Sequence, residues 1–266
     1  MNFNTLKRTL QPSKHVKTIV LGHQKSGTTA IAALLAKSTG ASYSNDPLYQ
    51  IDRGLGLAAN KLLSTPQKLN YYTHRHPILF GCDIIKDPDL IFTWPQINKV
   101  FERANYVFVL RDPRDNIRSI CDRLALKGKN STPIPSIKQL DRGNNHWHQI
   151  ISGQLPPLSS SLSNNYIINL AKRWNHAATI CAKNEDKMLI VKYEDFKANK
   201  GEVIHNLAEK LALPIKNDIS KDLSKQFQKA GNSNIQWEDF YSQENLELIE
   251  EICAENMSHF GYNNSN

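Results

Sequence analysis

The chain has 266 residues, which is enough for one large α/β domain with a substantial core. Its apolar content of 40% and charged content of 22% are ordinary for a soluble globular protein. The formal net charge of +8 suggests an acidic ligand or partner, although a solvated basic surface would carry the same charge.

The cysteines and the apolar runs indicate the cellular compartment and the relation of the protein to membranes. The four cysteines lie far apart, in apolar stretches, and show no metal-ligand spacing, so we expect buried free thiols, no metal and a reducing compartment. The first 16 residues have no apolar core of signal-peptide length, and no run approaches the roughly 20 residues that span a bilayer. These features predict a cytoplasmic protein that does not enter a membrane.

The first elements predicted along the chain are a buried strand and a buried helix. Residues 18–21 form a short apolar run that ends at Gly22, as in a parallel strand. Residues 30–36 are apolar nearly all round and favour a helix that ends near Gly40.

Two further strands are predicted at residues 82–85 and 106–110. The second leads into a helix start, where Asp112 can cap the helix, Pro113 fits its first position and Asp115 completes a variant of the capping box. The apolar face of this helix carries Ile117, Ile120, Cys121 and Leu124.

The remaining elements continue the alternation. A helix with Leu170 and Trp174 on one face precedes a strand at residues 188–191, and helices follow at about 202–211 and 243–257. Strands alternating with helices predict a single α/β domain over residues 1–266, with a central parallel sheet flanked by helices. Residues 127–165 break the pattern and are rich in Pro, Ser, Asn and Gly, so we expect a long loop or lid there.

Residues 22–29, Gly-His-Gln-Lys-Ser-Gly-Thr-Thr, join the first strand to the first helix and predict an anion site. Backbone N–H groups and the helix N-terminus favour negative charge at such a turn. Lys25 adds a full charge, and Ser26, Thr28 and Thr29 add hydroxyl donors.

A nucleotide triphosphatase loop, G-x-x-x-x-G-K-[ST], is the first alternative. Gly22 and Gly27 have its spacing, but Thr28 stands where that loop requires lysine. The only lysine of this loop, Lys25, lies two residues before Gly27, which disfavours a P-loop kinase or NTPase.

The loop resembles the 5′-phosphosulfate loop of sulfotransferases that use PAPS (3′-phosphoadenosine 5′-phosphosulfate), with Gln24 in place of the usual Pro and Ala30 in place of the frequent Trp. A second segment, residues 109–119, resembles the 3′-phosphate motif of the same family. Arg111 ends a strand there, Ser119 lies two turns into the next helix, and both can reach one phosphate. The resemblance implies the P-loop-like sulfotransferase fold, PAPS as co-substrate and 3′,5′-ADP as product.

Two weaker matches complete the expected cofactor site. Residues 191–196 resemble a family segment whose Tyr lies near the adenine, which implies that role for Tyr193, although ordinary packing at the end of a strand explains it equally well. Residues 229–237 resemble a segment that wraps the 3′-phosphate, which implies contacts by Lys229, Ala230 and Gly231, and also by Asn232 and Ser233. The cofactor-binding residues expected from all four matches are Gln24, Lys25, Ser26, Gly27, Thr28, Thr29, Arg111, Ser119, Tyr193, Lys229, Ala230 and Gly231.

Sulfuryl transfer requires charge stabilisation on the leaving oxygen, alignment, and a base for the acceptor proton. Lys25 is expected at the leaving oxygen. Cytosolic members of the family often take the base from a K-[TS]-H segment, but here Pro88 stands at the His position, and the stretch resembles bacterial members in which Lys86 contacts the transferring group.

Other branches of the family take a carboxylate from the segment after the first helix, which makes Asp46 the candidate base; a turn-forming Asp before Pro is an equal explanation. Asp87, His74 and His76 are the further candidates. His146 and His148, which flank Trp147, are candidates for the acceptor pocket, and a surface loop explains them as well.

Together these features predict a cytoplasmic PAPS-dependent sulfotransferase, monomeric or homodimeric, that acts on a small-molecule acceptor of secondary metabolism. The other alternative, a nucleic-acid-binding protein with a basic surface, has no recognised motif or basic–aromatic stripe to support it.

Overall fold

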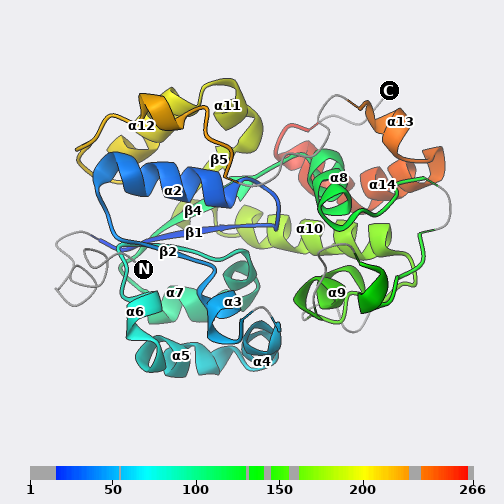
Figure 1. Ribbon diagram of the computed structural model, residues 1–266, viewed down its shortest axis with the longest axis horizontal. Coiled ribbons are helices and arrows are strands. Elements are labelled where there is room, and N and C mark those ends of the chain that lie inside the picture. Colours follow the sequence, from blue (N-terminus) through cyan, green and yellow to red (C-terminus); the bar gives the residue numbers. More distant parts are fainter. Residues whose placement is uncertain are drawn as a thin grey trace.

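The computed structural model describes residues 16–53, 55–129, 132–140, 145–155, 162–227 and 235–262 (Figure 1). Its centre is a five-stranded sheet in the order β2-β3-β1-β4-β5, in which every neighbouring pair is parallel. The strands are β1 (Thr18–Gly22), β2 (Tyr43–Asn45), β3 (Ile84–Lys86), β4 (Asn105–Leu110) and β5 (Met188–Lys192).

Each face of the sheet buries its own hydrophobic core, because successive side chains of a strand point to opposite faces. In β1, Val20 joins one core, and Ile19 and Leu21 join the other. Helices α2 (Thr28–Thr39) and α12 (Lys200–Lys210) cover the face of Val20, on the upper side of Figure 1. The predicted single α/β domain with a parallel sheet flanked by helices is therefore confirmed.

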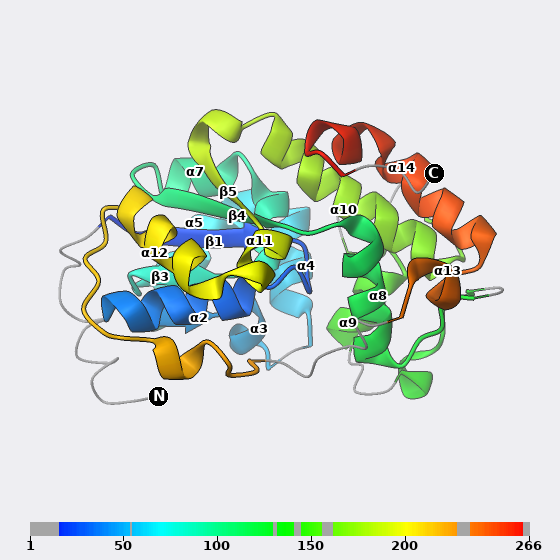
Figure 2. The ribbon, with the colours of Figure 1, turned by 90° about the horizontal axis from the view of Figure 1, so that it is seen from above.

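The other core is larger and extends past the sheet. Helices α8 (Pro113–Leu124), α9 (Asn145–Ile151), α13 (Trp237–Phe240) and α14 (Gln243–His259) gather beyond the C-terminal ends of the strands, and α10 (Tyr166–Ala182) runs from the sheet into this group (Figure 2). The remaining helices are α3 (Pro47–Ile51), α4 (Leu57–Ser64), η1 (Pro66–Lys68), α5 (Leu69–Arg75), α6 (Pro77–Phe80), η2 (Pro88–Thr93), α7 (Gln96–Val100), η3 (Ile137–Gln139), η5 (Glu185–Lys187), α11 (Tyr193–Ala198) and η6 (Ser220–Asp222).

Two elements differ from the sequence-based expectation. The strand β2 was not predicted, because it has only three residues, lies at the edge of the sheet and is only partly buried. The segment 127–165, expected as a long loop or lid, contains η3 and α9 within its described residues. Its role as a lid stays a prediction.

The start of α8 confirms the predicted cap and corrects the predicted capping box. The Asp112 carboxylate accepts the N–H of Arg114 at 2.9 Å, as an N-cap does. The N–H of Asp112 itself donates to Glu194 Oε1 at 3.0 Å, and Asp115 accepts from Trp237 Nε1 at 2.9 Å. The capping-box prediction is therefore wrong, because the N–H of Asp112 donates to Glu194 instead of Asp115, and the Asp115 carboxylate accepts from Trp237.

The four cysteines are buried free thiols, as expected. Among the described residues, no helix has both the length and the apolar character needed to cross a bilayer.

Candidate functional site

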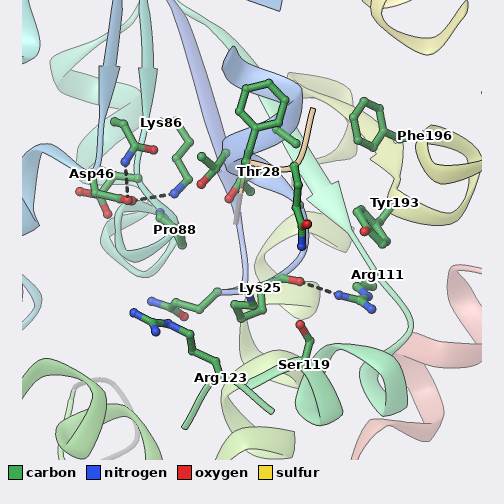
Figure 3. Close-up of a pocket in the computed structure, with 18 of the residues that line it drawn as sticks. Lys25, Thr28, Asp46, Lys86, Pro88, Arg111, Ser119, Arg123, Tyr193 and Phe196 are labelled. Atoms are coloured by element: carbon green, nitrogen blue, oxygen red, sulfur yellow. Dashed lines mark hydrogen bonds and ion pairs between the residues drawn. The ribbon is translucent and has the colours of Figure 1, made fainter. Parts of the chain in front are cut away.

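A cleft of about 750 Å³ opens at the C-terminal ends of the strands, where the loop after β1 meets α8, α9 and α11 (Figure 3). Parallel sheets bind ligands at this edge, because the loops and helix N-termini converge there. Most of the predicted site residues line this cleft: Gln24, Lys25, Gly27, Thr28, Thr29, Asp46, Lys86, Asp87, Arg111, Ser119 and Tyr193.

The loop after β1 needs both of its glycines. Gly22 has φ +150°, and a Cβ there would lie 2.6 Å from the carbonyl oxygen of Val109 on the next strand. Gly27 has φ +93°, and a Cβ there would lie 2.3 Å from Tyr193 Cδ2. The loop is therefore pressed between the sheet and α11, and the N-terminus of α2 opens on the cleft.

Hydrogen bonds among buried side chains hold the loop after β1 in place. Asn116 Nδ2 donates to the carbonyl oxygen of Gln24 and to Ser26 Oγ, both at 3.0 Å. The Gln24 side chain donates to Asp89 Oδ1 at 2.7 Å, so the residue that replaces the usual Pro has a partner of its own. The side chains of Gln24 and Ser26, predicted as cofactor contacts, thus bind other parts of the protein, and Ser26 does not line the cleft.

Lys25 lies at the crown of the loop in the left-handed region, with φ +67°. Burial, together with the charges of Arg111, Arg123 and Lys86, lowers the pKa of its ammonium group to about 8. So many cations around one cleft are costly unless an anion neutralises them. The region therefore has the electrostatics of an anion site.

Arg111 joins the two predicted phosphate-binding segments. Its Nη1 donates to the carbonyl oxygen of Lys25 at 2.9 Å, and its guanidinium lies 4.5 Å from the centre of the Tyr193 ring. Figure 3 shows Ser119 and Arg111 on the same side of Lys25. The structure thus brings Lys25, Arg111, Ser119 and Tyr193 together.

The carboxylate candidates directly follow two strands, Asp46 after β2 and Asp87 after β3. Figure 3 shows Asp46 on the side of Lys25 opposite Arg111 and Ser119. Asp46 Oδ1 accepts from Lys86 Nζ at 2.8 Å, and Asp46 is partly exposed whereas Lys86 is buried. Asp87 is buried, and its two oxygens accept the N–H groups of Leu48 and Asp89 at 3.0 Å each. Burial and the charge of Asp89 raise the pKa of Asp87 to about 8, well above the usual range of a carboxyl group.

The candidate histidines separate into two groups. His74 lies on α5 and His76 at its C-terminal end, and neither lines the cleft. His146 lines the cleft together with Trp147, and its Nε2 lies 3.1 Å from Asp89 Oδ2; His148 does not line it. The Asp89 carboxylate raises the pKa of His146 against the effect of burial.

Residues 229–233, expected at the 3′-phosphate, lie outside the described residues. Their neighbour Trp237 packs on α8, with its ring 3.8 Å from the Arg114 guanidinium carbon. The structure adds cleft residues that sequence reasoning missed: Arg118, Arg123, Lys197, Lys200, Lys225 and Phe227. Two of them had a local signal, because Arg118 lies within the segment 109–119, and Arg123 follows Ser119 by one helical turn and shares its face.

Comparisons with known proteins agree with this geometry. The family model described as "Sulfotransferase domain" matches residues 15–260. Solved structures similar to this chain include sulfotransferase STF9 from Mycobacterium avium (14% identity, TM-score 0.58, covering 97% of this chain and 80% of that one) and a sulfotransferase from Alicyclobacillus acidocaldarius (9%, 0.53, 92% and 94%). The sulfotransferase domain of the curacin biosynthetic pathway is similar as well (12%, 0.52, 94% and 99%). The curated proteins gave no match.

Proposed function

Because the chain belongs to the sulfotransferase family, we propose that it moves a sulfuryl group from PAPS to a hydroxyl or amine of a small-molecule acceptor and releases 3′,5′-ADP. The observation that carries this proposal is one cleft with two cationic binding regions. The loop of Lys25 forms one, and Arg111 with Ser119 forms the other. A nucleotide with a phosphate group at each end matches this arrangement.

In this proposal the loop binds the 5′-phosphosulfate. The N-terminus of α2 and the hydroxyls of Thr28 and Thr29 face the 5′ end. The guanidinium of Arg111 and the hydroxyl of Ser119 bind the 3′-phosphate, since an arginine fork suits a phosphate. Lys229, Ala230 and Gly231 remain proposed partners of the same phosphate, and Tyr193 of the adenine.

The chemistry assigned to the protein is alignment, charge stabilisation and proton removal. The acceptor oxygen or nitrogen attacks sulfur in line, the bond from sulfur to the 5′-phosphate oxygen breaks, and Lys25 stabilises the charge on that leaving oxygen. Asp46 takes the acceptor proton, and Lys86 orients it through their 2.8 Å ion pair. Asp87 is a weaker candidate base, because its oxygens already accept two backbone N–H groups.

Calorimetric titration with 3′,5′-ADP tests the donor assignment. We expect micromolar binding or tighter that does not depend on magnesium. ATP binding that requires magnesium, with no affinity for 3′,5′-ADP, would instead indicate a P-loop kinase or NTPase. Incubation with labelled PAPS and a panel of acceptors then tests transfer, and the acceptor class is read from the labelled products.

A further inference from the structure

Arg123 is a cation of the cleft that the donor site does not use. It lies near the end of α8, one turn after Ser119, and lines the cleft in a partly buried position. Within the part of the chain that the structure describes, it makes no hydrogen bond or ion pair. A guanidinium that lines a cleft and has no protein partner there is free to bind an anionic ligand.

The position of Arg123 separates it from the proposed 3′-phosphate site. Figure 3 shows its side chain on the side of Lys25 that faces Asp46 and Pro88, away from Arg111 and Tyr193. It lies close enough for its charge to lower the pKa of Lys25. In-line transfer requires the acceptor to approach sulfur from the side opposite the leaving oxygen, so this end of the cleft is where the acceptor would lie.

Among the described residues, none of the carboxylates around the cleft forms an ion pair with Arg123. Lys86 and Asp46 neutralise each other in their ion pair, and burial and the charge of Asp89 raise the pKa of Asp87, which favours its uncharged form. Asp122, the adjacent carboxylate, acts on Lys25 and raises its pKa. The buried Asp89 is engaged by Arg173, His146 and Gln24.

We propose that Arg123 is a specificity-determining residue that binds an oxyanion of the acceptor, so that the preferred acceptor carries a carboxylate or a comparable acidic group besides its reacting hydroxyl or amine. A guanidinium suits this role, because it donates two parallel hydrogen bonds to a carboxylate. Tyr49 and Trp147 line the same cleft and offer aromatic surface to the body of the acceptor. This inference rests on the proposed function and adds the substrate class.

The test uses two probes of the same shape that differ in charge, 4-hydroxybenzoate and 4-hydroxybenzamide, titrated into enzyme saturated with 3′,5′-ADP. The proteins are the wild type, Arg123→Gln and the control Arg103→Gln, which removes an exposed arginine just before β4, at the other end of the sheet. We expect the wild type to bind the carboxylate at least about tenfold more tightly than the amide, since hydrogen bonds to charged groups are strong. Arg123→Gln should lose this preference, and Arg103→Gln should keep it.

The affinity of the binary complex separates this inference from the proposed function. Arg123→Gln should bind 3′,5′-ADP as the wild type does. If it weakens 3′,5′-ADP binding as much as Arg111→Ala, Arg123 belongs to the donor site and the inference is overturned. It is overturned too if the wild type does not prefer the carboxylate, or binds neither probe. A wild type that fails to bind 3′,5′-ADP would overturn the proposed function itself.

Discussion

At the scale of single residues, side chains of the same type have different environments in the cleft. Lys25 and Lys86 both line the cleft, but Lys86 is paired with Asp46, whereas Lys25 lies among Arg111, Arg123 and Lys86. Asp46 and Asp87 also differ, because one is partly exposed and the other is buried. Environment, more than residue type, therefore decides each role.

Lys25→Ala is expected to lower turnover more than it lowers affinity for 3′,5′-ADP. Loss of a donor to a developing oxyanion typically costs about 10²- to 10³-fold in rate. Arg111→Ala should show the opposite pattern, because we propose that Arg111 binds the 3′-phosphate. Steady-state kinetics and calorimetry on both variants check the assignment, and the reverse pattern would exchange the two roles.

The pKa of Lys25, lowered to about 8, predicts a pH limit to activity. In the proposed mechanism the ammonium form stabilises the leaving oxygen, and this form predominates below the pKa. We therefore expect kcat/KM to fall as pH rises through about 8. In Lys25→Arg the residual activity should not fall over this pH range, because a guanidinium stays charged. If kcat/KM of that variant still falls as pH rises through this range, the decrease belongs to the titration of another group.

Asp46→Asn tests the base. The amide keeps an oxygen that can accept from Lys86 but cannot take a proton, so turnover should fall by about 10²- to 10⁴-fold while 3′,5′-ADP affinity is retained. Asp87→Asn is the matched comparison, and its main effect should be on stability because the Asp87 oxygens accept backbone N–H groups. Unchanged turnover in Asp46→Asn would show that Asp46 is not the base.

At the scale of elements, Asp89 connects three segments that are distant in sequence. Its carboxylate lies in η2 and accepts from Gln24 of the loop after β1, from Arg173 of α10 and from His146 of α9, within 2.7 to 3.1 Å. Arg173 is fully buried, with its guanidinium 3.9 Å from the Phe92 ring. The loop and the two helices are thus held by one buried anion.

Asp89→Asn should destabilise the fold strongly. Removing the carboxylate leaves the buried Arg173 charge uncompensated, which typically costs about 3–5 kcal/mol. Urea unfolding followed by circular dichroism measures the change in the free energy of unfolding. The exposed Asp186→Asn serves as the control and should change it by less than about 0.5 kcal/mol. Equal stability of the two variants would contradict the role given to Asp89.

At the scale of the whole molecule, the residues that line the cleft come from the sheet side and from the helices beyond its C-terminal edge. The loop after β1 lies on the sheet side of the cleft, whereas Ser119 and Arg123 lie on α8, one of the helices beyond the sheet. A ligand that contacts both should stabilise the fold as a unit, because it binds the native state alone.

We expect 3′,5′-ADP to raise Tm without magnesium. At a concentration of 100 times Kd, the expected stabilisation is about 2.7 kcal/mol. The control 5′-AMP lacks the 3′-phosphate and should raise Tm less, and the difference between the two should shrink in Arg111→Ala. The shift should weaken with added salt, since charges are screened. Equal shifts by both nucleotides in the wild type would contradict a 3′-phosphate site.

Much of the fold follows from local patterns in the sequence. The strands β1, β3, β4 and β5 and the helices α2, α8, α10, α12 and α14 were predictable, because buried strands and amphipathic helices carry their own apolar periodicity. The short strand β2 was not, because its pairing with β3, Tyr43 opposite Ile84, depends on a partner 41 residues away. The helix α9 was not, because a polar segment gives no clear periodicity.

The sequence by itself determined that the loop after β1 and Arg111 lie close together, since both directly follow buried strands, and strand ends of a parallel sheet meet at one edge. Only the tertiary structure decided that Gln24 binds Asp89, that Asp46 pairs with Lys86, and that Arg123 turns into the cleft. The physical reason is the sequence distance over which each interaction acts. A turn and the start of its helix depend on residues only a few positions apart. Ion pairs and buried charges depend on which distant elements the two cores bring together.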